Sequence, residues 1–121
     1  MARILVIDDE EPIRELLRHV LEKEGHEVVE ARHGKDAIRL AKVSPLDLVI
    51  TDIMMPEQDG LEVITTLRRE SPDLKILAIS GGGLLHSRAL HVADLLGAFD
   101  TLQKPFALDV LIGKVNGALA A

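Results

Sequence analysis

Short apolar runs alternate along the whole chain with segments of helical periodicity, and this alternation limits the chain to few folds. The expected strands are Ile4 to Ile7, Leu48 to Thr51, Lys75 to Ile79 and Phe99 to Gln103, with a weaker one at Glu27 to Ala31, and Ile4 to Ile7 is apolar throughout. Continuous apolar runs of this length are typical of parallel strands covered on both faces. We therefore expect an α/β fold with a doubly wound, five-stranded parallel sheet of order 2-1-3-4-5, and Glu27 to Ala31 at its edge.

The segments between the runs predict five helices with short connections. The first has Pro12 near its start and Gly25 after its end, and the second includes Ala37 to Ala41 and stops at Ser44-Pro45. Asp59 and Glu62 resemble the two acceptors of a capping box that opens the third. The fourth is expected over Leu84 to Leu96 and the fifth over Leu108 to Leu119. In the fourth, Leu84, Leu85, Leu95 and Leu96 are expected to pack on the sheet.

Length and composition narrow the functional classes. The 121 residues fit one domain spanning 1–121, and the absence of cysteine excludes disulfides and thiolate metal sites. No apolar stretch reaches the length of a membrane span and the first residues do not resemble a signal peptide, so we expect a cytoplasmic location. A net charge of -6 opposes direct binding to nucleic acid or to anionic lipid.

Acidic residues follow the first and third strands, which the expected order makes neighbours. Asp8 and Asp9 come after the first run, and Asp52 comes after the third. In an open α/β sheet the ligand crevice lies at the carboxyl ends of the strands, so these carboxylates should meet there. Mutual repulsion of three acids is relieved by a cation, and Mg²⁺ suits oxygen ligands best. The sequence therefore predicts a magnesium site.

Two further residues complete a possible phosphoryl-transfer site. Lys104 follows the last strand and would bring a positive charge to the same crevice, while Ser80, at the end of the fourth strand, adds a hydroxyl. A fixed cation beside carboxylates suits the charge that develops on a transferring phosphoryl group. We therefore predict Asp52 as a nucleophile that forms an acyl phosphate, with Lys104 and Ser80 assisting.

These motifs together resemble a response-regulator receiver domain of two-component signalling, over essentially the whole chain. They are Asp8-Asp9, Asp52 with Met55-Pro56 and Gly60, Ser80, Gly97-Ala98 and Lys104-Pro105-Phe106. The resemblance implies a flavodoxin-like fold and a signalling phosphoacceptor that promotes its own phosphorylation and dephosphorylation, not an enzyme acting on separate substrates. It also implies a sensor histidine kinase or histidine phosphotransfer protein as donor, and a downstream effector protein as partner.

The resemblance also assigns a role to each site residue. Asp52 resembles the phosphoacceptor, Asp9 the direct Mg²⁺ ligand and Asp8 the acid that holds metal-bound water, and the main-chain carbonyl of Met54 would be a further ligand. Lys104 resembles the lysine that contacts the phosphoryl group, with a usually cis bond to Pro105, and Ser80 resembles the switch hydroxyl. In relatives, dimers or partners dock on the face of the fourth helix, fifth strand and fifth helix.

Two departures leave an alternative open. Thr101 stands where relatives commonly carry Tyr or Phe, and Gly81-Gly82-Gly83 follows the switch hydroxyl where relatives usually have Ala and a polar residue. Both features favour a rival interpretation, an interaction module that works without phosphorylation. A third hypothesis, a small Mg²⁺-dependent phosphatase, lacks the acid two residues after the nucleophile, because that position is Met54. The run from Asp8 to Glu11 could also be only a solvated helix start.

Overall fold

Five parallel strands form a single sheet. The computed structural model describes residues 1–53, 60–81 and 91–121, and the order of the strands is β2-β1-β3-β4-β5. All four neighbouring pairs are parallel. The predicted order and the edge position of the second strand are confirmed. The strands are β1 (Arg3–Ile7), β2 (Glu27–Ala31), β3 (Leu48–Asp52), β4 (Lys75–Ser80) and β5 (Asp100–Gln103).

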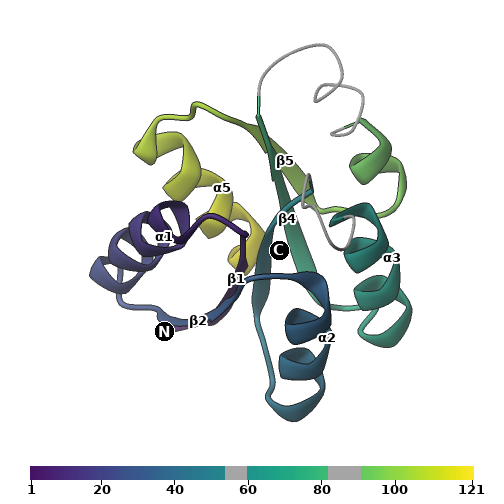
Figure 1. The fold of residues 1–121 in the computed structure, drawn as a ribbon. Coiled ribbons are helices and arrows are strands. Elements are labelled where there is room, and N and C mark those ends of the chain that lie inside the picture. Colours follow the sequence, from purple (N-terminus) through teal and green to yellow (C-terminus); the bar gives the residue numbers. More distant parts are fainter. Residues whose placement is uncertain (54–59, 82–90) are drawn as a thin grey trace.

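Helices cover both faces of the sheet (Figure 1). Helices α1 and α5 lie on one side, and α2 and α3 lie on the other. Pro12 stands in the first turn of α1, where its missing N–H costs no helical hydrogen bond. The bounds are α1 (Glu11–Lys23), α2 (Gly34–Val43), α3 (Gly60–Glu70) and α5 (Leu108–Ala120). Residues 91–95 are also helical.

Alternate residues of each strand enter two separate hydrophobic cores. On β1, Leu5 and Ile7 join the core beneath α2 and α3, whereas Ile4 and Val6 join the core beneath α1 and α5. All four side chains are at most 1% exposed. Successive side chains of a strand point to opposite faces, so a strand buried on both faces must be apolar throughout. This explains why the central strands appear in the sequence as continuous apolar runs.

The end of the fourth predicted helix differs in part from expectation. Residues 91–95 are helical as predicted, but Leu95 is 72% exposed and Leu96 is 38% exposed, so the prediction that these two pack on the sheet is wrong. Ala93 is the residue that this stretch buries. At about 100° per residue, Leu95 lies on the side of the helix opposite to Ala93. Gly97 follows with a φ of 109°, a left-handed conformation that ends the helix.

Several predictions concern residues outside the described ranges. They include the capping role of Asp59, the carbonyl of Met54, the Met55-Pro56 motif, Gly82-Gly83, the helical start at 84–90 and the packing of Leu84 and Leu85 on the sheet. Within the described ranges, no helix has both the length and the apolar character needed to span a membrane.

Candidate functional site

The two acids after β1 differ in their surroundings. Asp8 is 2% exposed, whereas Asp9 is exposed to solvent. Oδ1 of Asp8 accepts a hydrogen bond from the Glu10 N–H at 2.9 Å, which fixes the side chain against the start of α1. Burial raises the pKa of the Asp8 carboxyl, outweighing the Glu10 N–H and the nearby Lys104 ammonium, which lower it.

Asp52 ends β3 and meets the acids that follow β1. β1 pairs with β3 in parallel, so the ends of both strands lie at the same edge of the sheet. Asp52 is 6% exposed, and one carboxylate oxygen from each of Asp8, Asp9, Glu10 and Asp52 lies within 4.8 Å of the others. The predicted meeting of Asp8, Asp9 and Asp52 is thus confirmed.

Glu10 also belongs to this cluster, although its sequence position did not mark it as a site residue. It is exposed and follows directly after Asp9. The available signal was the unbroken run of acids from Asp8 to Glu11, which sequence patterns alone interpret equally well as a solvated helix start. The approach of this third acid to Asp52 depends on the conformation of the turn between β1 and α1, which the run of acids does not specify.

Lys104 brings a cation to the same place. Its Nζ lies 3.1 Å from Oδ2 of Asp52 and 3.2 Å from Oδ2 of Asp8. Burial on its own would lower the pKa of Lys104, but the carboxylates of Asp52 and Asp8 outweigh it and the net shift is upward. The ammonium is therefore held in its charged form. We call Asp8, Asp9, Glu10, Asp52 and Lys104 together the acidic site.

Ser80 lies at the end of β4, next to the strand that carries Asp52. It is fully buried, and its main-chain carbonyl accepts a hydrogen bond from the Lys104 N–H at 2.6 Å. The Lys104-Pro105 peptide bond is cis, as the resemblance implied. The backbone of the switch candidate is thus joined directly to the residue that bears the cation.

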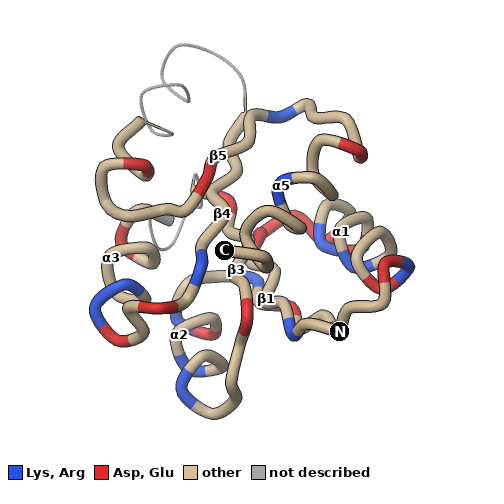
Figure 2. The backbone as a smooth tube through the Cα atoms, turned by 180° about the vertical axis from the view of Figure 1, so that it is seen from behind, with Lys and Arg blue, Asp and Glu red and all other residues tan. Residues whose placement is uncertain are grey.

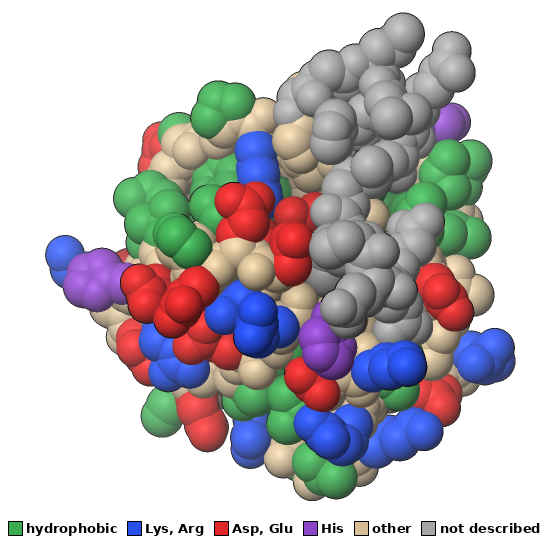
Figure 3. All heavy atoms as spheres, in the orientation of Figure 1, with side chains coloured by type: hydrophobic (Ala, Val, Ile, Leu, Met, Phe, Trp, Pro, Cys, Tyr) green, Lys and Arg blue, Asp and Glu red, His purple; other side chains and the backbone are tan. Residues whose placement is uncertain are grey.

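The donor set of the acidic site fits a hard divalent cation. Each of its four acids offers a carboxylate oxygen, and one lysine balances only part of their charge. Mg²⁺ prefers such oxygen ligands, and few of them from the protein. Asp9 and Glu10 are exposed, so the cluster is open to solvent. Figure 3 shows acidic side chains gathered beside a basic one on the face that it draws.

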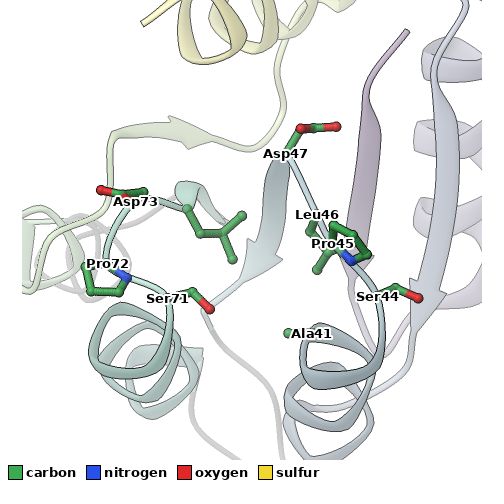
Figure 4. A pocket seen from close by; sticks show the side chains of 9 residues that line it. Ala41, Ser44, Pro45, Leu46, Asp47, Ser71, Pro72 and Asp73 are labelled. Carbon is green, nitrogen blue, oxygen red and sulfur yellow. The ribbon is translucent and has the colours of Figure 1, made fainter.

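A separate cavity lies at the opposite end of the sheet. It has a volume of about 420 Å³ and lies between the segments that lead into β3 and β4 (Figure 4). Asp47 on its rim accepts a hydrogen bond from the Arg3 N–H at 2.8 Å, which ties the cavity wall to β1. Because parallel strands all start at one edge and end at the other, this cavity is remote from the acidic site.

Comparisons with known proteins agree with this geometry. Residues 4–116 match the family model of the response regulator receiver domain. The response regulator MprA of Mycolicibacterium vanbaalenii is 42% identical over 119 residues, which cover 98% of this chain and 50% of MprA. The chain therefore spans about half the length of the curated relatives it matches.

Solved structures agree as well. NtrX of Brucella abortus superposes with a TM-score of 0.93 at 35% identity, over 98% of this chain and 27% of that one. The response regulator TrrA of Thermotoga maritima, solved in complex with Mg²⁺-BeF, gives a TM-score of 0.87 at 39% identity, over 98% of this chain and 100% of TrrA. The chain belongs to the response regulator receiver domain family of two-component signalling.

Proposed function

We propose that residues 1–121 form one receiver domain that accepts a phosphoryl group on Asp52 from a phosphohistidine donor, with Mg²⁺ bound beside it. The observation that carries this proposal is the position of Lys104, whose Nζ lies 3.1 Å from Asp52 and 3.2 Å from Asp8. A carboxylate acts as a nucleophile toward phosphorus when nearby cations offset the repulsion between its charge and that of the phosphoryl oxygens.

The step exchanges one bond to phosphorus for another. A carboxylate oxygen of Asp52 forms a bond to phosphorus while the bond from phosphorus to the donor's imidazole nitrogen breaks, and that nitrogen keeps the bonding electron pair. Lys104 is positioned to balance the charge of the phosphoryl oxygens. Later attack of water on phosphorus releases inorganic phosphate and restores the Asp52 carboxylate. The chain thus acts on its own residue, not on a separate substrate.

Mg²⁺ would be held by Asp8, Asp9 and Asp52, with the main-chain carbonyl of Met54 as a further ligand. The fit rests on the four carboxylates that lie within 4.8 Å of one another, with Glu10 adding negative charge at the solvent side. When bound, Mg²⁺ supplies positive charge to the phosphoryl oxygens. The structure of TrrA with Mg²⁺-BeF supports this proposal by analogy.

Ser80 is the proposed switch residue. Its hydroxyl would turn to donate a hydrogen bond to the phosphoryl group on Asp52. Its carbonyl accepts a hydrogen bond from the Lys104 N–H at 2.6 Å. A displacement of Ser80 would therefore also displace the backbone of Lys104, which follows β5. Phosphorylation would thereby shift the balance between two conformations, as in other ligand-driven switches.

An apolar hollow beside Lys104 is the proposed contact for the phosphohistidine donor. It has a volume of about 460 Å³ and is shared by α1 and the start of α5. Because Lys104 lines this hollow, a protein bound there would lie next to the acidic site. We propose a sensor histidine kinase or a histidine phosphotransfer protein as the occupant. The lining residues are Ile13, Leu16, Lys104, Pro105, Phe106 and Leu108.

The output surface is proposed on the face formed by residues 91–95, β5 and α5, where a homodimer or a partner would dock. Val92, Leu95, Phe99 and Val110 are between 39% and 72% exposed. Exposed apolar side chains of this size favour a protein contact. A downstream effector protein or a second copy of this chain would bind there after the switch.

Binding of beryllofluoride, which mimics an aspartyl phosphate, tests this proposal. We expect ¹⁵N-labelled protein with Mg²⁺ to show slow-exchange shifts of the Ser80 and Lys104 amides on addition of beryllofluoride. Asp52→Asn should show none, because it lacks the carboxylate that holds beryllium. Unchanged spectra for the wild type would contradict the proposal and favour the module that works without phosphorylation.

A further inference from the structure

Arg14 is a buried cation outside the acidic site. Within the described residues, the buried polar or charged set consists of Asp8, Arg14, Thr51, Asp52 and Ser80, and three of these belong to the proposed phosphoryl-transfer machinery. Arg14 is only 7% exposed. A buried charge is costly unless it is paired and hydrogen-bonded. The hydrogen-bond partners of this guanidinium therefore indicate the role of Arg14.

Two hydrogen bonds fix the plane of the guanidinium. Nη1 of Arg14 donates to the main-chain carbonyl of Asp8 at 2.6 Å, and Nε donates to Oε1 of Glu30 at 3.2 Å. Oε2 of Glu30 accepts a bond from Nε of Arg18 at 2.6 Å, so the carboxylate is itself held from both sides. Figure 2 shows the basic and acidic positions interspersed along α1. A planar guanidinium held by two bonds in different directions has little freedom to turn.

The carbonyl that Arg14 holds belongs to the peptide group between Asp8 and Asp9, the two acids that follow β1. That group is planar, so fixing the Asp8 carbonyl also fixes the direction of the Asp9 N–H and the position of the Asp9 Cα. The other polar groups of Asp8 are engaged too. Its N–H donates to the carbonyl of Ala31, Oδ1 accepts from the Glu10 N–H, and Oδ2 accepts from Lys104.

We infer that Arg14 is a positioning residue for the metal-binding acids: through the Asp8 carbonyl it sets the relative orientation of the Asp8 and Asp9 carboxylates, and Glu30 holds Arg14 for this task. This inference rests on the proposed Mg²⁺ site. Partners that orient metal ligands from outside typically contribute about 10- to 100-fold to metal affinity.

The loss of the Arg14 charge and the loss of the orientation that Arg14 provides should change the Mg²⁺ affinity in opposite directions. Removing a positive charge near a cation site should by itself tighten Mg²⁺ binding. Loss of orientation should weaken it. A weaker Mg²⁺ affinity in a variant without the Arg14 charge therefore reports orientation and cannot be produced by charge.

Arg18 provides the matched control. It also donates to Glu30, but its side chain is 38% exposed and it pairs with Glu30 and Glu22, not with the backbone of Asp8. Arg14→Met and Arg18→Met therefore each remove one positive charge, and each removes one hydrogen-bond donor to Glu30. Only Arg14→Met releases the peptide group between Asp8 and Asp9.

The test is isothermal titration of purified, metal-free protein with MgCl₂, together with thermal unfolding in EDTA. We expect Arg14→Met to raise the Mg²⁺ dissociation constant about tenfold or more, and Arg18→Met to leave it within about twofold of wild type. Arg14→Met should also move the amide resonances of Asp9 and Glu10 in the metal-free protein. A variant that melts lower yet binds Mg²⁺ as tightly as Arg18→Met would overturn the inference and leave Arg14 a purely structural role.

A second pair keeps the test decisive should Arg14→Met fail to fold. Arg14→Lys keeps the charge but cannot hold Glu30 and the Asp8 carbonyl in one plane, and Arg18→Lys is its control. We expect weaker Mg²⁺ binding for Arg14→Lys alone, and equal binding of the two would overturn the inference. If the wild type itself binds no Mg²⁺, the proposed function fails at its metal site, which is a different result.

Discussion

Nζ of Lys104 donates a hydrogen bond to Oδ2 of Asp52 at 3.1 Å, although 52 positions separate the two residues. β4 lies between β3, which carries Asp52, and β5, which precedes Lys104, so the contact passes over the end of a whole strand. The same ammonium reaches Asp8 after β1 at 3.2 Å. One cation thus joins the ends of three strands and offsets the repulsion between their acids.

Replacing that cation should destabilise the metal-free protein. Lys104→Met leaves two buried carboxylates without their ammonium partner, and we expect the free energy of unfolding in EDTA to fall by about 2 kcal/mol. Lys114→Met is the control, because its partly exposed bond to Asp100 should contribute about 1 kcal/mol or less. Added Mg²⁺ should stabilise Lys104→Met more than wild type. Urea unfolding checks this, and equal losses for both variants would count against the assigned role.

The stability contribution of Asp8 should depend on pH. Burial raises the pKa of the Asp8 carboxyl above its ordinary value of 3.8, so the folded state binds this proton more tightly than the unfolded chain does. The resulting stabilisation is fully present below pH 3.8 and is lost as the pH rises through the folded pKa.

Asp8→Asn removes the ionised form and with it this loss. In EDTA at neutral pH we expect the variant to melt at a higher temperature than wild type, with the difference shrinking as the pH falls toward 3.8. Melting followed by circular dichroism at several pH values measures this. A difference that stays constant or grows on acidification would show that burial does not govern this carboxyl.

A substitution in the hollow beside Lys104 should impair binding of the histidine kinase without changing the phosphorylation reaction at Asp52. Leu16→Glu places a charge in the proposed donor contact. We therefore expect slower transfer of the phosphoryl group to this variant from autophosphorylated histidine kinases, and the assay uses a panel of purified kinases. Labelling by acetyl phosphate, which needs no docking, should be unchanged. Leu95→Glu is the matched control, since Leu95 is exposed on the proposed output surface. Equal effects of the two variants on kinase labelling would contradict the assignment of the hollow.

Two glycines allow the cost of a left-handed backbone to be separated from that of a close contact. Gly25 has a φ of 90° and open space around the position of a Cβ, whereas Gly97 has a φ of 109° and a Cβ there would lie 3.0 Å from Nε of Arg68. We expect Gly25→Ala to cost about 1 kcal/mol in unfolding free energy and Gly97→Ala clearly more. Chemical denaturation of both variants measures the difference, and equal costs would mean that Arg68 moves aside freely.

The fold could be predicted from the sequence because each strand leaves its own signal. The burial of Leu5 and Ile4 in opposite cores makes β1 a continuous apolar run, and Gly25 and Ser44-Pro45 mark helix ends. The edge strand β2 was recognisable because Glu27 and Glu30 interrupt its apolar residues. The other edge strand, β5, carries a single apolar residue, Leu102. The prediction for Leu95 and Leu96 was wrong, since composition alone does not tell which side of a short helix meets the sheet.

The acidic site was predictable in part. Strand order brings Asp8 and Asp52 together, so their meeting follows from topology once the sheet is assigned. The approach of Glu10 and the contact of Arg14 with the Asp8 carbonyl could not be predicted in this way. They depend on the conformation of the turn into α1 and on one side-chain rotamer, which leave no periodic signal in the sequence.

The central claim, that Asp52 is the phosphoacceptor, is tested most directly by mass. Purified protein is incubated with acetyl phosphate and Mg²⁺, and its intact mass is measured beside that of Asp52→Asn and of a sample containing EDTA. The account predicts the mass of one added phosphoryl group on the wild type with Mg²⁺, and no addition in either control. An unmodified wild type, or equal labelling of Asp52→Asn, would contradict it.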